Sequence, residues 1–170
     1  EDAHEFIDFA VDGASRMKSL ITDLLTYSRV QRSTADFTDT DMLEVLDRVR
    51  YNLQVSIEDK GAVITHDDLP HIVGNDGQMV QLLQNLIGNA LKFHNDEAPQ
   101  IHVGVKREKK HWQFSIRDNG IGIDPAYKDR IFVIFQRLHS RQDYSGTGIG
   151  LAICRKIVEK HDGKIWFESE

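Results

Sequence analysis

Residues 81–96 read QLLQNLIGNALKFHND, and this stretch decides the fold of the chain. The stretch belongs to a helix expected to begin at Asp76, whose apolar side chains recur at helical spacing and are expected to face a core: Met79, Leu83, Leu86, Ile87, Ala90 and Leu91. Amide and ammonium groups share another face of the same helix, because they follow one another at steps of 4, 4 and 3: Gln81, Asn85, Asn89 and Lys92. Such a face suits an oxygen-liganded Mg²⁺ and the phosphates that accompany it. The alternative is an ordinary solvated helix face.

A second stretch, residues 145–158 (SGTGIGLAICRKIV), places Gly146, Gly148 and Gly150 where a helix is expected to begin. Backbone amides and the helix dipole can face a phosphate chain at such a point. A Rossmann dinucleotide site is excluded, because the preceding residues are polar and Leu151 occupies the third glycine position. The phosphate-binding loop of P-loop proteins is excluded as well, because GxxxxGK[ST] does not occur.

A third stretch, residues 114–125 (FSIRDNGIGIDP), ends an alternating strand on Asp118 and continues with Gly120 and Gly122. This order predicts a carboxylate at a sheet edge, beside a loop that a ligand can approach closely. A partly desolvated Asp118 could accept a hydrogen bond from an exocyclic amine such as that of adenine. The alternative is an ordinary turn.

In their order and spacing these segments resemble the catalytic, ATP-binding domain of two-component sensor histidine kinases, within the wider gyrase, chaperone and mismatch-repair ATPase superfamily. Residues 81–96 resemble the N box, 118–124 (DNGIGID) the first glycine box, 132–141 (FVIFQRLHSR) the F box and 146–153 (GTGIGLAI) the second glycine box. The resemblance implies an α/β (α+β) two-layer sandwich of the Bergerat type, with a mixed sheet backed by helices. It also implies ATP and Mg²⁺ as cofactors, with ATP held under a mobile lid.

The family's functional residues carry over by position. Asn89 resembles the Mg²⁺ ligand, and the expected catalytic residues are Asn85, Lys92 and Arg137. The residues expected to bind the cofactor are Asn89, Asp118, Gly120, Gly122, Arg141, Gly146, Thr147, Gly148, Gly150 and Leu151. Phe132 and Phe135 are expected to anchor the lid in the core, and His139 is a further lid residue. For Arg141 the alternative is simple surface polarity of the lid.

One departure from the superfamily bears on the chemistry. Its ATPases carry a Glu four residues before the Mg²⁺-liganding Asn to activate water, and this chain has Asn85 there. An amide is no general base, so the sequence favours transfer of the γ-phosphate to an acceptor over hydrolysis. The expected activity is therefore that of a protein-histidine kinase. An ATP-hydrolysing relative and a non-catalytic nucleotide-binding scaffold remain the alternatives.

Residues 3–32 carry a heptad seam: Ile7, Ala10, Ala14, Met17, Ile21, Leu24 and Ser28. The seam predicts a long, coiled-coil-like helix that another helix covers. The alternative is that the helix packs on its own domain. Its end, residues 17–30 (MKSLITDLLTYSRV), resembles the second helix of the family's dimerisation and phosphoacceptor hairpin. The resemblance implies a homodimer through that hairpin, a phosphoacceptor His on a first helix that lies upstream, and a response-regulator receiver domain as partner. His4 is the alternative acceptor, but Phe9 stands where the acceptor box has Pro.

Composition limits what else the chain can do. Its 170 residues hold 21 Lys and Arg against 27 Asp and Glu, a net charge of −6, so no broad positive surface for nucleic acid is expected. The longest apolar run, residues 131–135, is too short to cross a membrane. The single Cys154 excludes an internal disulfide and fits a cytoplasmic setting, whether or not the full-length protein is membrane-attached. The histidines lack zinc-site spacing, and Glu1 in place of Met suggests a fragment.

Two regions are expected, a partial hairpin at 1–35 and the catalytic domain at 36–170. A linker covers 31–41 and ends in a helix cap before Met42, and Asp76 is expected to cap the N-box helix. The expected helices are 42–59, with a stop at Gly61, then 76–93, 125–135 and 148–161. The expected strands are 62–66, 71–73, a hairpin of 101–105 with 112–116, and 164–168.

Overall fold

The computed structural model describes residues 2–32, 36–127, 130–136 and 146–169. The helices are α1 (Asp2–Arg32), α2 (Met42–Asn52), α3 (Gln54–Lys60), α4 (Asp76–Lys92) and α5 (Gly150–Lys160), with a short 3₁₀ helix η1 (Pro125–Tyr127). The strands are β1 (Thr38–Asp41), β2 (Val63–His66), β3 (His71–Gly74), β4 (Gln100–Arg107) and β5 (Trp112–Asp118). Among the helices of this described part, none combines the length and hydropathy that a membrane crossing requires.

The strands form two sheets in the described residues. In the three-stranded sheet, of order β2-β4-β5, β2 runs parallel to β4 while β4 and β5 form an antiparallel hairpin. A separate antiparallel pair joins β1 to β3. The sheet is therefore mixed, as expected from the sequence.

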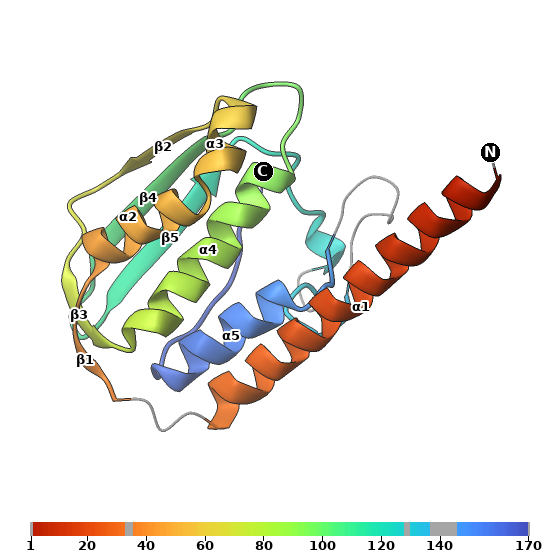
Figure 1. Ribbon diagram of the computed structural model, residues 1–170. Coiled ribbons are helices and arrows are strands. Elements are labelled where there is room, and N and C mark those ends of the chain that lie inside the picture. The colour runs from red at the N-terminus through yellow and green to blue at the C-terminus, as the bar shows by residue number, and fades with distance from the viewer. Residues whose placement is uncertain (1, 33–35, 128–129, 137–145, 170) are drawn as a thin grey trace.

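The helices form a layer against one face of the three-stranded sheet (Figure 1). Within that layer α4 packs between α2 and α5, and α5 in turn contacts α1. The core lies between the layers and includes Leu46 of α2, Ile87 of α4 and Ile101 of β4, each at most 1% exposed. The predicted two-layer sandwich is confirmed. The long N-terminal helix is present as α1, whereas its coiled-coil pairing stays a prediction.

Several expected boundaries are wrong. The polar segment Thr38–Asp41 forms β1, because its four residues pair with β3 and Thr40 donates a hydrogen bond to the Gly74 carbonyl oxygen (3.1 Å). The helix expected at 42–59 is divided at Leu53 into α2 and α3. Residues 164–168 are not a strand, because no described strand pairs with them. In the described part of 125–135 only the short η1 is helical, and turns follow it.

The caps are partly as expected. Asp41 caps α2 by accepting a hydrogen bond from the Leu43 amide (2.8 Å), and Gly61 ends α3 with φ of 60°. The cap of α4 is Asn75 rather than Asp76, because the Asn75 side chain accepts from the Gln78 amide (3.0 Å). Asp76 is the first residue of α4.

We expect Asn75→Ala to lower the free energy of unfolding by about 1 kcal/mol, because the first turn of α4 loses its side-chain acceptor. Urea unfolding followed by circular dichroism measures the change. Asn75→Asp, which keeps an acceptor oxygen, is the matched control and should stay close to the parent. Equal losses in the two variants would show that the cap contributes nothing.

Candidate functional site

The polar face of α4 lies beside the start of α5. Asn85 Nδ2 donates to the Gly150 carbonyl oxygen (3.4 Å), across 65 residues of sequence. Asn89 lies one turn further along α4 and Lys92 two turns further. Both are half-buried on the same side of the helix. Met79, Leu83 and Ile87 of α4 are buried in the core. The face therefore meets the glycine-rich segment instead of bulk solvent alone.

The glycine-rich segment, residues 146–150, has a backbone that few other residues can adopt. Gly146 has φ of 137° and Gly148 has φ of 74°. A Cβ placed on Gly146 would lie only 2.8 Å from Lys92 Nζ, so the loop and the ammonium group approach closely. The N-cap of α5, Ile149, offers no side-chain hydrogen bond to the first turn. Backbone amides, a helix N-terminus and a cation thus converge on one place, which is the chemistry of an anion site.

Asp118 ends β5 on the face of the sheet that packs against the helices. It pairs in register with buried Ile101, so both side chains lie on the side of the sheet that holds Ile116. The Asp118 carboxylate accepts a hydrogen bond from the Gly120 amide (2.8 Å). The Asp118 side chain is exposed, so the expectation that this carboxylate is partly desolvated is wrong.

The turn after Asp118 is fastened to the end of α4. The Ile121 amide donates to the Phe93 carbonyl oxygen (3.1 Å), and a Cβ on Gly120 would lie 2.4 Å from that same oxygen. Gly122 follows with φ of 70°. Since Lys92 immediately precedes Phe93, this contact brings the first glycine box next to the polar face of α4. Three segments that are far apart in sequence therefore meet at the C-terminal end of one helix.

Sequence reasoning missed Asn119, which fixes the same turn. Its Oδ1 accepts from the Gln100 amide (2.8 Å) and its Nδ2 donates to the Ala98 carbonyl oxygen (3.2 Å). These bonds join the end of β5 to the segment that enters β4. The available signal was an Asn directly after a strand, a residue type that readily bonds to nearby backbone.

A family model for the histidine kinase-, DNA gyrase B- and HSP90-like ATPases matches residues 74–170, more than half of the chain. The chain belongs to this family. It is also 56% identical over 169 residues to cyanobacterial phytochrome A of Nostoc sp., a match that covers 99% of this chain and 22% of that protein. The chain thus spans less than a quarter of that relative.

Two solved structures share the ATPase-family fold. Full-length ShkA in complex with AMPPNP matches with a TM-score of 0.73 at 23% identity, over 99% of this chain and 37% of ShkA. Histidine kinase ThkA in complex with the response regulator protein TrrA matches with a TM-score of 0.74 at 22% identity, over 100% of this chain and 48% of ThkA. At these identities the likeness establishes the fold alone.

Part of the expected lid of this ATPase-family domain lies outside the described residues. Arg137, His139 and Arg141 are the lid residues outside the described part. The side chain of His4, the alternative acceptor in α1, is outside it as well. Phe135 is described, and the expectation that it anchors the lid in the core is wrong, because it is 55% exposed with φ of 63°. Ile131 is the buried residue of this segment, and Phe132 is half-buried. The Phe135 amide nevertheless donates to the Gly148 carbonyl oxygen (3.0 Å), which ties the F box to the glycine-rich segment.

The remaining candidates of the glycine-rich segment differ in what they contact. Leu151 is half-buried in the first turn of α5. Thr147 Oγ1 donates to Asp23 Oδ2 of α1 (2.5 Å), a contact that no local sequence pattern predicted.

On α5, burial raises the pKa of the Cys154 thiol to about 12, so this thiol stays protonated at neutral pH. Cys154 is therefore a packing residue, in agreement with its apolar sequence surroundings.

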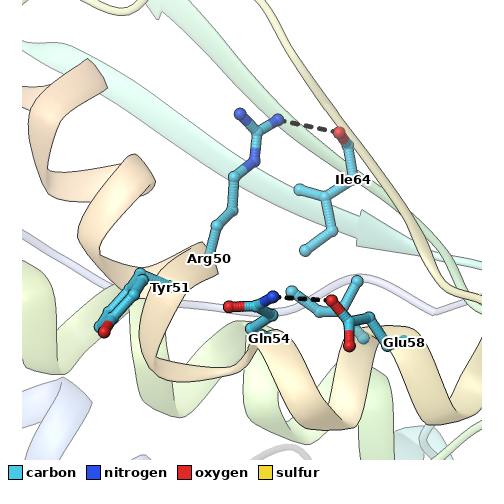
Figure 2. Close-up of a pocket in the computed structure, with 6 residues that line it drawn as sticks. Arg50, Tyr51, Gln54, Glu58 and Ile64 are labelled. Atoms are coloured by element: carbon cyan, nitrogen blue, oxygen red, sulfur yellow. Dashed lines mark hydrogen bonds between the residues drawn. The ribbon is translucent and has the colours of Figure 1, made fainter.

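A hollow of about 390 Å³ lies elsewhere, between α2, α3 and β2 (Figure 2). In this hollow Arg50 donates to the Ile64 carbonyl oxygen (2.9 Å), and Gln54 donates to Glu58 (2.7 Å). None of the residues that line it belongs to the N box, to either glycine box or to the F box. We therefore place the candidate site at the C-terminal end of α4.

Proposed function

We propose that this chain binds Mg-ATP and transfers the γ-phosphate to a histidine on an upstream helix, for relay to a response-regulator aspartate. The observation that carries the proposal is the convergence of Asp118, Lys92 and the glycine-rich segment at the end of α4. Membership of the histidine kinase-, gyrase B- and HSP90-like ATPase family supports ATP as the ligand. We further propose that residues 1–35 and 36–170 are separate domains.

Each proposed role follows from position and chemistry. Asp118 accepts a hydrogen bond from the exocyclic amine of adenine, since its carboxylate lies at the rim of the site on the helix side of the sheet. Lys92 and the backbone amides of the glycine-rich segment hold the phosphates. Arg137 and Arg141 are proposed to reach the γ-phosphate from the lid. Asn85 lies beside the first residue of α5 and has no basic oxygen with which to activate water.

The oxygen and nitrogen groups at the proposed site fit Mg²⁺ better than they fit a metal ion whose ligands come mainly from protein side chains. Among the described residues no group of three or more His, Cys, Asp or Glu side chains could hold a metal ion. In the same part of the chain the Asn89 side chain makes no hydrogen bond, which leaves its amide oxygen available as a ligand. Mg²⁺ typically takes one or two protein oxygens and completes its shell with phosphate and water. When bound, it would neutralise charge on the phosphates.

The proposed partners rest on exposed surface and on family relationship. The predicted heptad seam is largely uncovered, because Ile7, Met17, Ile21 and Leu24 are all exposed on α1. A helical hairpin and its dimer mate would bury this seam. A receiver domain as second partner is supported by the fold shared with ThkA, which was solved in complex with response regulator protein TrrA. No nucleic acid or membrane partner is proposed.

Asp118→Asn tests the adenine assignment. We expect ATP affinity to fall about tenfold, because the charged acceptor for the exocyclic amine is lost. Preference for ATP over GTP should narrow as well. Isothermal titration calorimetry with both nucleotides and Mg²⁺ measures the change, with circular dichroism to show that the variant is folded.

Asp68→Asn is the matched control, because Asp68 is an exposed carboxylate in the loop between β2 and β3. It should bind ATP like the parent. Unchanged ATP affinity in a folded Asp118→Asn variant would remove the adenine role. Absence of any ATP binding by the parent would contradict the proposed function as a whole.

A further inference from the structure

The helix α1 touches the catalytic part of the chain through one face. Leu20 and Tyr27 of α1 pack against the core cluster, and Val30 is 4% exposed. The Val30 carbonyl oxygen accepts a hydrogen bond from Lys160 Nζ at the end of α5 (3.2 Å). Figure 1 shows the C-terminal half of α1 running alongside α5, while its N-terminal half extends away from the sheet. This docked face is distinct from the exposed heptad seam.

Asp23 is the charged member of the docked face. Leu20, Asp23, Tyr27 and Val30 follow at steps of 3, 4 and 3 and therefore share one side of the helix. Asp23 Oδ2 receives its hydrogen bond from Thr147 Oγ1 in the middle of the glycine-rich segment, 124 residues away, and the contact is partly buried. The three companions of Asp23 on this face are apolar or aromatic. One carboxylate is thus directed at the loop that we propose as the phosphate site.

The contact competes with a phosphate for the same atoms. The Thr147 hydroxyl carries one proton, so it can donate to Asp23 or to a phosphate oxygen but not to both. A carboxylate held at this loop also repels a polyphosphate, and the repulsion is stronger in a partly buried setting than in bulk water. Docked α1 should therefore lower affinity for polyphosphates. By linkage, a bound polyphosphate should weaken the docking of α1 to the same extent.

We propose that Asp23 is a latch, which holds α1 on Thr147 while the site is free of nucleotide and is released when a nucleotide polyphosphate binds. This inference rests on the proposed function, since it takes the glycine-rich segment as the phosphate site. Asp23 acts here as a positioning residue for α1. It sets how nucleotide binding and helix docking depend on one another.

The first test is a calorimetric comparison of ATP, ADP and adenosine binding to the whole chain with Mg²⁺. In Asp23→Asn the charge is lost and the shape is kept, so ATP should bind roughly five-fold more tightly, a modest step for one partly buried like charge. The gain should shrink for ADP and vanish for adenosine. Asp12→Asn is the matched control, because Asp12 lies on the same helix in an exposed pair with Arg16.

The second test follows α1 itself by amide hydrogen exchange. Residues 20–30 should exchange faster in the parent when Mg-ATP is added, because the latch opens. Asp23→Ala and Thr147→Val should show the faster exchange without nucleotide, and Asp12→Ala should not. This readout does not depend on phosphate transfer.

The outcomes separate the two proposals. Equal or weaker ATP affinity in Asp23→Asn, or an equal gain for adenosine, would overturn the latch while leaving ATP binding intact. Amide exchange rates in residues 20–30 that are the same in Asp23→Ala as in the parent would overturn the latch as well. No ATP binding by the parent would instead overturn the proposed function.

Discussion

Asn89→Ala should lower γ-phosphate transfer by at least about a hundredfold, since removing one oriented group that holds a reacting centre in line commonly has an effect of this size. Asn89 lies on the polar face of α4, one turn beyond Asn85, which contacts the Gly150 carbonyl oxygen. Its amide oxygen is the proposed Mg²⁺ ligand. Without it the metal and the phosphates lose their link to α4.

The assay supplies radiolabelled ATP, Mg²⁺ and a separate protein that carries the upstream acceptor helix. Label on histidine is acid-labile and base-stable, and mass mapping identifies the labelled residue. Gln84→Ala is the matched control, because Gln84 lies on the same helix and accepts an exposed hydrogen bond from Asn52 (3.0 Å), away from the site. Transfer by Asn89→Ala at the parent rate would refute the metal role, and label on Ser, Thr or Tyr would refute the proposed chemistry.

The elements predicted well from sequence are those whose burial pattern is strong and local. The core face of α4 and the alternation of β4 and β5 each appear within a single window of sequence. β1 was missed because its residues, TDTD, carry no apolar alternation. It is a strand only because β3 pairs with it and the Thr40 side chain is buried against that partner. Long-range pairing of this kind leaves no local signal.

The same distinction applies to the candidate site. The glycines and polar residues of the motifs were identified from sequence, but how they are held together was not. The contact between Thr147 and Asp23 joins residues 124 positions apart, and the exposed Phe135 reflects a backbone of positive φ that an apolar residue rarely adopts. Residues 164–168 (KIWFE) are the converse case. Their sequence predicts a strand, but no described strand pairs with them.

Gly120→Val should cost both stability and nucleotide binding, because the position has no room for a side chain. A Cβ there would lie 2.4 Å from the Phe93 carbonyl oxygen and 2.7 Å from Asp118 Oδ1. The first of these atoms is backbone at the end of α4 and cannot rotate away. We expect the free energy of unfolding to fall by about 1–3 kcal/mol, the usual cost of forcing extra atoms into a packed site.

In Gly120→Val the affinity for ATP should fall by more than the loss of folding stability alone explains, because the clash forces the turn away from α4. The Ile121 amide would then lose its bond to the Phe93 carbonyl oxygen (3.1 Å), and Asp118 would separate from the polar face of that helix. Urea unfolding and calorimetric titration of ATP measure the two effects on the same sample. Gly77→Ala, whose added Cβ meets only Asn75 Oδ1 at 3.8 Å, is the control and should be at least as stable as the parent. A folded Gly120→Val variant with full ATP affinity would show that the two motifs need not meet at the end of α4 for nucleotide to bind.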